Sequence, residues 1–91
     1  MSETKKPQVL NVRILSPRQV IFEGDALSVS SKNLSGNFDI LPFHANFITL
    51  IEKSPVKIIK PDKTVTNFDF DVAILFQINN QVNIYTELEF K

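Results

Sequence analysis

Residues 74–86 have the sequence ILFQINNQVNIYT, in which two runs of strand-forming side chains flank the pair Asn79-Asn80. β-Branched and aromatic residues favour strands, and asparagine tolerates the left-handed backbone conformations of a tight hairpin. The stretch therefore predicts a hairpin between residues 74–78 and 82–86, and it places the chain in the β class.

Strand patterns continue upstream of this hairpin. In residues 66–72 threonine, phenylalanine and valine alternate with asparagine and aspartate, and a period of two is typical of a strand with one covered face. A turn at residues 61–63 precedes this run, and a corner is expected at residues 53–55, because proline cannot donate to a ladder. Further strands are predicted at residues 10–14, 20–22, 27–31, 38–41, 47–51 and 56–60.

No segment keeps its apolar residues at helical spacing for three turns. We therefore expect an all-β domain, a flattened β-sandwich or barrel of about eight to ten short strands. Most of the aromatic side chains fall on the apolar faces of these strands and are assigned to the core: Phe22, Phe38, Phe68, Phe70 and Phe76.

The chain has 91 residues, ten basic and ten acidic side chains and no cysteine. Balanced charge gives no attraction to nucleic acid or to an anionic membrane, and the lack of cysteine excludes disulfides and thiolate metal sites. No apolar run reaches the roughly 20 residues of a membrane span, and the start does not have the pattern of a signal peptide. We expect one intracellular domain at residues 8–88, with a flexible leader at residues 1–7 and a tail at residues 89–91.

Side chains able to support catalysis are few. His44 is the only imidazole, and neither a nucleophile elbow nor a phosphate loop is present. Asp69 and Asp71 lie two residues apart and have a spacing able to chelate a hard cation, but such a pair is more often a solvated strand face. We expect no catalytic residue, no cofactor and no metal site. An enzyme or metal-binding protein that uses His44 and the aspartates is the weakest hypothesis.

Residues 36–46, GNFDILPFHAN, contain the only histidine and one of the two glycines. This segment joins a short strand to a loop bounded by Pro42. Phe43 lies in the loop and has no strand neighbours to cover it. Two interpretations of Phe43 remain open: an exposed aromatic anchor for a partner, or a side chain that folds back to plug the end of the sandwich.

Three parts of the chain together resemble the ε subunit of F-type ATP synthases. LNVRILSP at residues 10–17 and VIFEG at residues 20–24 are similar to the family's opening strand and its S-P-E-x-x-x-F-x-G text. The last stretch, residues 74–87, follows the family's hairpin, so the resemblance covers about residues 8–88. The family's central text, G-E-x-G-I-L-P-G-H-A-P-x-x-T-x-L, is matched in register at Gly36, Ile40, Leu41, Pro42, His44, Ala45, Thr49 and Leu50.

Several positions depart from the family's pattern. Phe43 replaces the usual glycine and Asn46 the usual proline, while Asn37 stands where an acidic residue is common and Asp39 where a glycine often sits. Most members continue into an α-helical hairpin that is linked to ATP sensing and inhibition, whereas this chain stops at Lys91. The resemblance therefore implies a short form without the hairpin, or a longer native chain.

The resemblance implies a rotor subunit of the central stalk of a proton- or sodium-driven synthase, without chemistry of its own. It would be peripheral at the cytoplasmic face of a bacterial cell membrane, with an organellar inner or thylakoid membrane as the second choice. Its partners would be the γ subunit and the c-ring. The alternative is a free-standing β-sandwich protein-interaction module, since a fold alone does not define a function. The resemblance puts Asn37, Phe38 and Asp39 on the c-ring side, Ser16, His44 and Thr49 on the γ side, and Phe43 on either surface.

Overall fold

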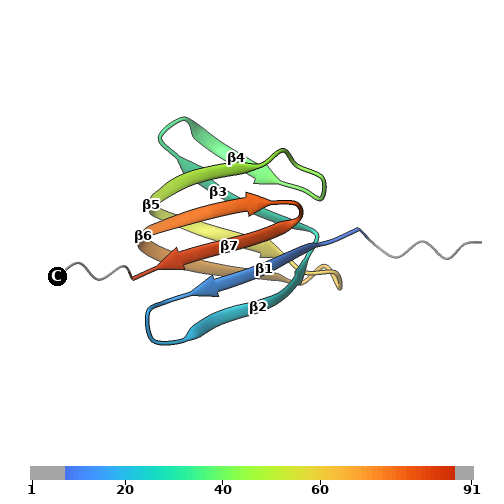
Figure 1. Cartoon of the computed structure of the whole chain (residues 1–91), viewed down its shortest axis with the longest axis horizontal. Helices are drawn as coiled ribbons and strands as arrows, with labels where there is room; N and C mark the ends of the chain where they lie inside the picture. The colour runs from blue at the N-terminus through green and yellow to red at the C-terminus, as the bar shows by residue number, and fades with distance from the viewer. Residues whose placement is uncertain (1–7, 88–91) are drawn as a thin grey trace, which may run out of the picture.

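The computed structural model describes residues 8–87, which form seven strands in one continuous sheet (Figure 1). The order in the sheet is β2-β1-β7-β6-β5-β3-β4, and all neighbours are antiparallel except β1 and β7, which are parallel. The all-β prediction is confirmed, while the predicted leader and tail lie outside the described residues. The strands are β1 (Leu10–Leu15), β2 (Val20–Ala26), β3 (Ser28–Asn33), β4 (Gly36–Ile40), β5 (Phe47–Ile59), β6 (Val65–Ile78) and β7 (Gln81–Thr86).

β5 and β6 are the longest strands, with 13 and 14 residues. Each continues where the sequence predicted two shorter strands, so residues 8–87 contain seven strands rather than eight to ten. The corner expected at residues 53–55 does not end β5. Lys53 instead takes a left-handed φ of 48°, and the ladder between the two strands is interrupted only there, with the same register before and after it.

This interruption changes which side chains of β5 point inward. Ile51 is buried before it, whereas Val56 and Ile58 are buried after it. Neighbouring residues of a strand face opposite sides, so the change from odd to even positions lets both halves of the strand cover one core. Figure 1 shows the first half of β5 and the second half of β6 in front with β7, β1 and β2, while their other halves lie behind with β3.

The core lies between these two layers. Two buried polar side chains donate to backbone carbonyls: Gln77 Nε2 to His44 at 3.1 Å, and Thr86 Oγ1 to Val72 at 3.3 Å, while the buried Oε1 of Gln77 has no partner among the described residues. The fully buried apolar side chains are Leu10, Val12, Ile14, Ala26, Val29, Ile40, Ile51, Val56, Ile58, Ala73, Leu75, Val82 and Ile84.

Two aromatic pairs close the open sides of the sheet. β2 and β4 are its edge strands, and each sends one phenylalanine against a strand with which it is not paired. Phe22 of β2 packs edge-on against Phe68 of β6, with ring centroids 5.8 Å apart. Phe38 of β4 packs in the same way against Phe47 of β5 at 5.3 Å. Side-chain packing therefore joins the two layers where backbone hydrogen bonds do not.

The predicted turns after β5 and β6 are confirmed. Asn79 and Asn80 connect β6 to β7 with φ angles of 50° and 65°. Between β5 and β6, Asp62 Oδ1 accepts hydrogen bonds from the Thr64 hydroxyl at 2.6 Å and the Thr64 N–H at 2.9 Å. These two hydrogen bonds hold the pKa of the Asp62 carboxyl below its usual value, which stabilises the ionised form in the turn.

The edge-on contact between Phe22 and Phe68 predicts a coupling energy between the two side chains. In a double-mutant cycle with alanine, followed by urea unfolding, we expect a coupling of about 0.5–1.5 kcal/mol, as measured for aromatic pairs of this geometry. The matched control combines Phe22→Ala with Phe47→Ala, one residue from each aromatic pair. The changes in unfolding free energy of these two variants should add within about 0.5 kcal/mol. Additivity of the first pair as well would show that the rings do not stabilise each other.

Candidate docking face

The outward side of the front layer carries a continuous apolar surface. Leu50 lies opposite Ile74, and Ile74 opposite Tyr85. In the neighbouring row Ile48 lies opposite Phe76, and on the same side of β6 Phe76 is flanked by Ile74 and Ile78. We call this surface the apolar face. It consists of Leu15, Val20, Ile48, Leu50, Val72, Ile74, Phe76, Ile78 and Tyr85.

Much of the apolar face is open to solvent. Ile48 is 62% exposed, Val20 51% and Ile78 47%, while Ile74, Phe76 and Tyr85 are half-buried. Single exposed apolar residues are ordinary on a protein surface, but a contiguous patch of them marks an interaction site. The arrangement is therefore a candidate docking surface for a protein partner.

The prediction that Phe76 belongs to the core is wrong. Its ring lies on the outward side of β6 and packs edge-on against Tyr85, with centroids 5.7 Å apart. The other four aromatic assignments are confirmed, because these rings pack against the buried cluster. Residues 47–51 and 74–78 are apolar at nearly every position, which is typical of strands covered on both faces. This signal could have revealed the apolar face from the sequence.

Polar side chains border the apolar face on β1, β2 and β7. Arg13 Nε lies 3.0 Å from Glu23 Oε2 in a cross-strand ion pair. Gln81 Nε2 donates to Asn83 Oδ1 at 2.9 Å. An apolar centre with a polar, solvent-accessible rim is the usual anatomy of a protein interface, so the border agrees with a docking role.

The loop at residues 41–46 is held against the β6–β7 hairpin. Gln77 donates to the carbonyl of His44, the N–H of Phe43 donates to Asn80 Oδ1 at 2.7 Å, and the N–H of Asn79 donates to Asn46 Oδ1 at 3.2 Å. These contacts join segments more than thirty residues apart in the chain. They restrict the loop although it has no regular secondary structure.

His44 and Phe43 have different roles in this loop. The His44 ring packs edge-on against Phe47 at 5.8 Å, and its Nδ1 lies 2.8 Å from the carbonyl oxygen of Ala45. Phe43 is 70% exposed and has a left-handed φ of 67°. Of the two interpretations of Phe43, the exposed side chain is therefore the one that the structure shows.

The residues expected on the c-ring side divide between two environments. Asn37 and Asp39 project from the outer side of β4, opposite Lys32 and Ser30 of β3, and Ser30 Oγ donates to Asp39 Oδ1 at 2.5 Å. Phe38, between them, points inward and packs edge-on against Phe47. Only the first two side chains are therefore displayed on one surface.

The residues expected on the γ side do not come together. Ser16 lies in the turn after β1, where its hydroxyl accepts the N–H groups of Arg18 and Gln19. Thr49 lies within β5 and accepts a hydrogen bond from Asn33 Nδ2 at 3.0 Å. The β1–β2 turn and the β4–β5 loop that holds His44 are at opposite ends of the sheet in Figure 1. Their assignment to one partner stays a prediction.

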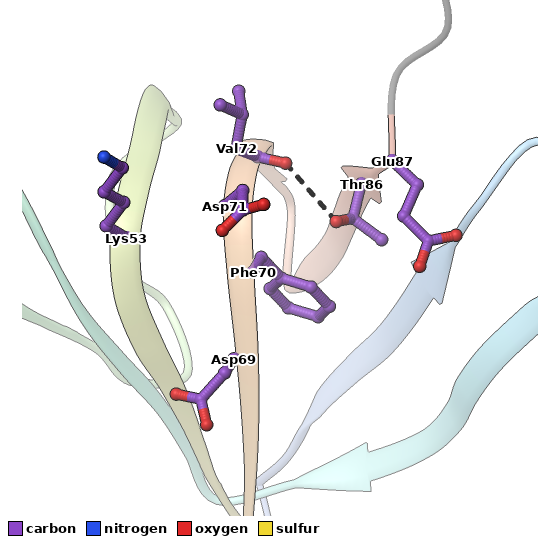
Figure 2. A pocket seen from close by; sticks show the side chains of 7 residues that line it. All are labelled: Lys53, Asp69, Phe70, Asp71, Val72, Thr86 and Glu87. Carbon is purple, nitrogen blue, oxygen red and sulfur yellow. Dashed lines mark hydrogen bonds between the residues drawn. The ribbon is translucent and has the colours of Figure 1, made fainter.

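A hollow of about 590 Å³ lies where β5 and β6 bend (Figure 2). Asp69 and Asp71, which the sequence suggested as a cation-chelating pair, both line it, and Figure 2 shows the two carboxylates separated along β6 with Phe70 between them. Among residues 8–87, no group of three or more histidine or acidic side chains is placed to hold a metal ion. The residues that line the hollow therefore give no support for a metal site.

The family of the chain follows from a comparison with known proteins. Residues 9–88 match the family model described as ATP synthase, Delta/Epsilon chain, beta-sandwich domain. The chain belongs to this family. The resemblance and the β-sandwich prediction are thereby confirmed, and membership supports the prediction of a chain without catalytic activity of its own. In the described residues, no helix is long and apolar enough to cross a membrane.

Individual proteins agree with the family match. The chain is 43% identical over 56 residues to the ATP synthase epsilon chain of Sulfurimonas denitrificans, a match that covers 62% of this chain and 43% of that protein. It is 30% identical over 82 residues to the epsilon chain of Clostridium kluyveri, covering 89% and 61%. The matched region thus spans less than two thirds of either relative.

A solved structure shares the fold. A chain in the cryo-EM structure of the Euglena gracilis mitochondrial ATP synthase, OSCP/F1/c-ring, superposes with a TM-score of 0.81. The match covers 97% of this chain and 61% of that chain at 9% sequence identity. At this identity the likeness concerns the fold alone.

Truncating a side chain is predicted to cost much more stability on the inward side of β5 than on its outward side. Leu50, on the apolar face, is 44% exposed, whereas its neighbour Ile51 is fully buried. We expect Ile51→Ala to lower the free energy of unfolding by about 2–5 kcal/mol. Leu50→Ala, the matched control, should change it by less than about 1 kcal/mol, because much of its side chain is already exposed to solvent. Urea unfolding measures both, and equal losses would place Leu50 in the core.

Proposed function

We propose that this chain is the ε-type central-stalk subunit of a proton- or sodium-driven F-type ATP synthase. It turns with the rotor, docks on the γ subunit and the c-ring, and helps to couple rotation to ATP synthesis without catalysing a reaction. Family membership over residues 9–88 supports the proposal, and so does a fold shared with a chain of an OSCP/F1/c-ring assembly. The single observation that carries the docking role is the apolar face.

The apolar face suits the γ subunit because it is broad and lies on a rigid support. In this region β1, β7 and the second half of β6 are hydrogen-bonded to neighbours on both sides, so a transmitted force meets a sheet instead of a flexible loop. Interfaces of standard size bury about 1,200–2,000 Å² in total. A contact of that kind covers Ile48, Leu50 and Phe76 together, and their burial stabilises the complex through the hydrophobic effect.

The c-ring contact in this proposal is a polar one. The outer side of β4 displays Asn37 and Asp39 beside Lys32 of β3. These hydrogen-bonding and charged groups suit the polar loops of a membrane ring better than the apolar face does. The two partner surfaces thus differ in chemistry, and this difference helps to orient the subunit between them.

The proposal places the chain on the cytoplasmic side of a bacterial cell membrane, attached through the complex. The bacterial origin of the relatives in sequence supports this location. A short form that ends with the β-sandwich domain, without the inhibitory helical hairpin, stays a prediction. The position of the stop codon in the native gene tests it directly.

A free-standing interaction module is the alternative that uses the same surface. It differs from the proposal in its partner and not in its chemistry, since the apolar face serves any complementary protein. Genes for the β, γ and other synthase subunits next to the gene for this chain would support the rotor subunit. Their absence, together with failure to bind γ, would support the module.

The apolar face predicts how charge affects γ binding. Ile48→Lys and Leu50→Lys place an ammonium group in the buried centre of the interface, where a charge without a partner is costly. By calorimetric titration we expect each variant to bind the cognate γ subunit at least about tenfold more weakly, with thermal unfolding close to that of the unaltered chain.

The matched control for these variants is Val65→Lys. Val65 is 51% exposed but lies at the start of β6, outside the apolar face, so γ affinity should not change. If the unaltered, folded chain does not bind γ at micromolar concentration, the proposed function is wrong. If it binds and neither face variant weakens the complex, γ uses a different surface.

A further inference from the structure

We infer that Phe43 is an aromatic anchor that determines specificity for the cognate γ subunit, by inserting its ring into an apolar socket of that partner. The inference rests on the proposed function, because it names a residue of the same γ contact. It goes beyond that proposal in locating the discrimination between γ subunits at one side chain outside the apolar face.

The backbone of Phe43 gives the first argument. A φ of 67° lies in the left-handed region, which is unfavourable for a bulky residue and easy for glycine. Since 70% of Phe43 is exposed, burial within the domain compensates little of this strain. An unfavourable residue that gains little inside the chain is explained by a contact outside it.

The loop presents this ring in a defined position. The N–H of Phe43 donates to Asn80 Oδ1, while Asn46 and the carbonyl of His44 are tied to Asn79 and Gln77. Ordering a loop on binding costs free energy, and a loop that is already held avoids much of that cost. A phenylalanine side chain has only two rotatable bonds to restrict, so it is an efficient anchor for a partner.

Position and chemistry favour γ over the c-ring as the partner of this ring. Phe43 is bonded to the β6–β7 hairpin, in which Ile78 is the last residue of the apolar face, so the loop continues the surface proposed for γ. The turn before β4, which holds Leu34, lies at the other end of that strand, close to Asn37. An aromatic ring also fits an apolar socket better than polar loops.

The test compares Phe43→Asn and Phe43→Tyr by calorimetric titration with purified cognate γ. Asparagine accepts the left-handed conformation but removes the ring, so γ affinity should fall about tenfold to thirtyfold, with Tm unchanged or raised. Tyrosine keeps the ring and should bind within about threefold of the unaltered chain. Leu34→Asn is the matched control. It removes an apolar side chain that is 96% exposed in the turn at the other end of β4, and γ affinity should not change.

Specificity is measured with a second γ subunit, one whose own ε chain has glycine at this position. The unaltered chain should prefer its cognate γ by at least about tenfold, and Phe43→Asn should lose most of this preference. The inference is overturned if Phe43→Asn binds cognate γ like the unaltered chain, if it weakens only c-ring binding, or if it lowers Tm. Failure of the unaltered chain to bind γ is a separate result, which overturns the proposed function itself.

Discussion

The ladder between β5 and β6 is the constraint on which the rest of the structure depends. It holds one register from Phe47 opposite Gln77 to Ile59 opposite Val65, although it is interrupted opposite Lys53. Because the register does not slip, each strand changes its inward-facing positions without losing its partner. Two strands thereby contribute to both layers, and the two edges left by this arrangement are closed by the pairs Phe22–Phe68 and Phe38–Phe47.

The same ladder creates the candidate docking face. In the front halves of β5 and β6 the inward positions, such as Ile51 and Leu75, belong to the core. The outward positions, such as Ile48 and Phe76, are apolar as well, although no segment among residues 8–87 covers them. A strand that is apolar on both sides in a sheet with one covered face indicates that a partner covers the other. The surface for docking is therefore built on the most extensively paired strands.

Much of the fold follows from local patterns in the sequence. The Asn79-Asn80 hairpin, the turn at residues 61–63 and the all-β class are all predictable, because turn chemistry and alternation are local properties. The continuity of β5 is not predictable in this way. Lysine has no special preference for a left-handed φ, so Lys53 gives no signal of a twist, whereas Pro55 gives a misleading signal of a break.

The candidate site is less predictable than the fold. The apolar runs at residues 47–51 and 74–78 indicate a second covered face, but only the register shows that Ile74 and Tyr85 join them to β1 and β2. The separation of Ser16 from His44 also depends on how the strands are ordered in the sheet. A linear motif assigns roles to residues, but it does not show which of them share a surface.

The short strand β4 gives the two proposed contacts a fixed relation. At about 3.3 Å per residue, its five residues span roughly 16 Å between the β3–β4 turn and the loop of Phe43. Both ends are tied to other strands, the first by pairing with β3 and the second by hydrogen bonds to the β6–β7 hairpin. A load applied at one contact therefore reaches the other through hydrogen-bonded sheet. This stiffness is what a subunit held between γ and the c-ring needs in order to turn with both.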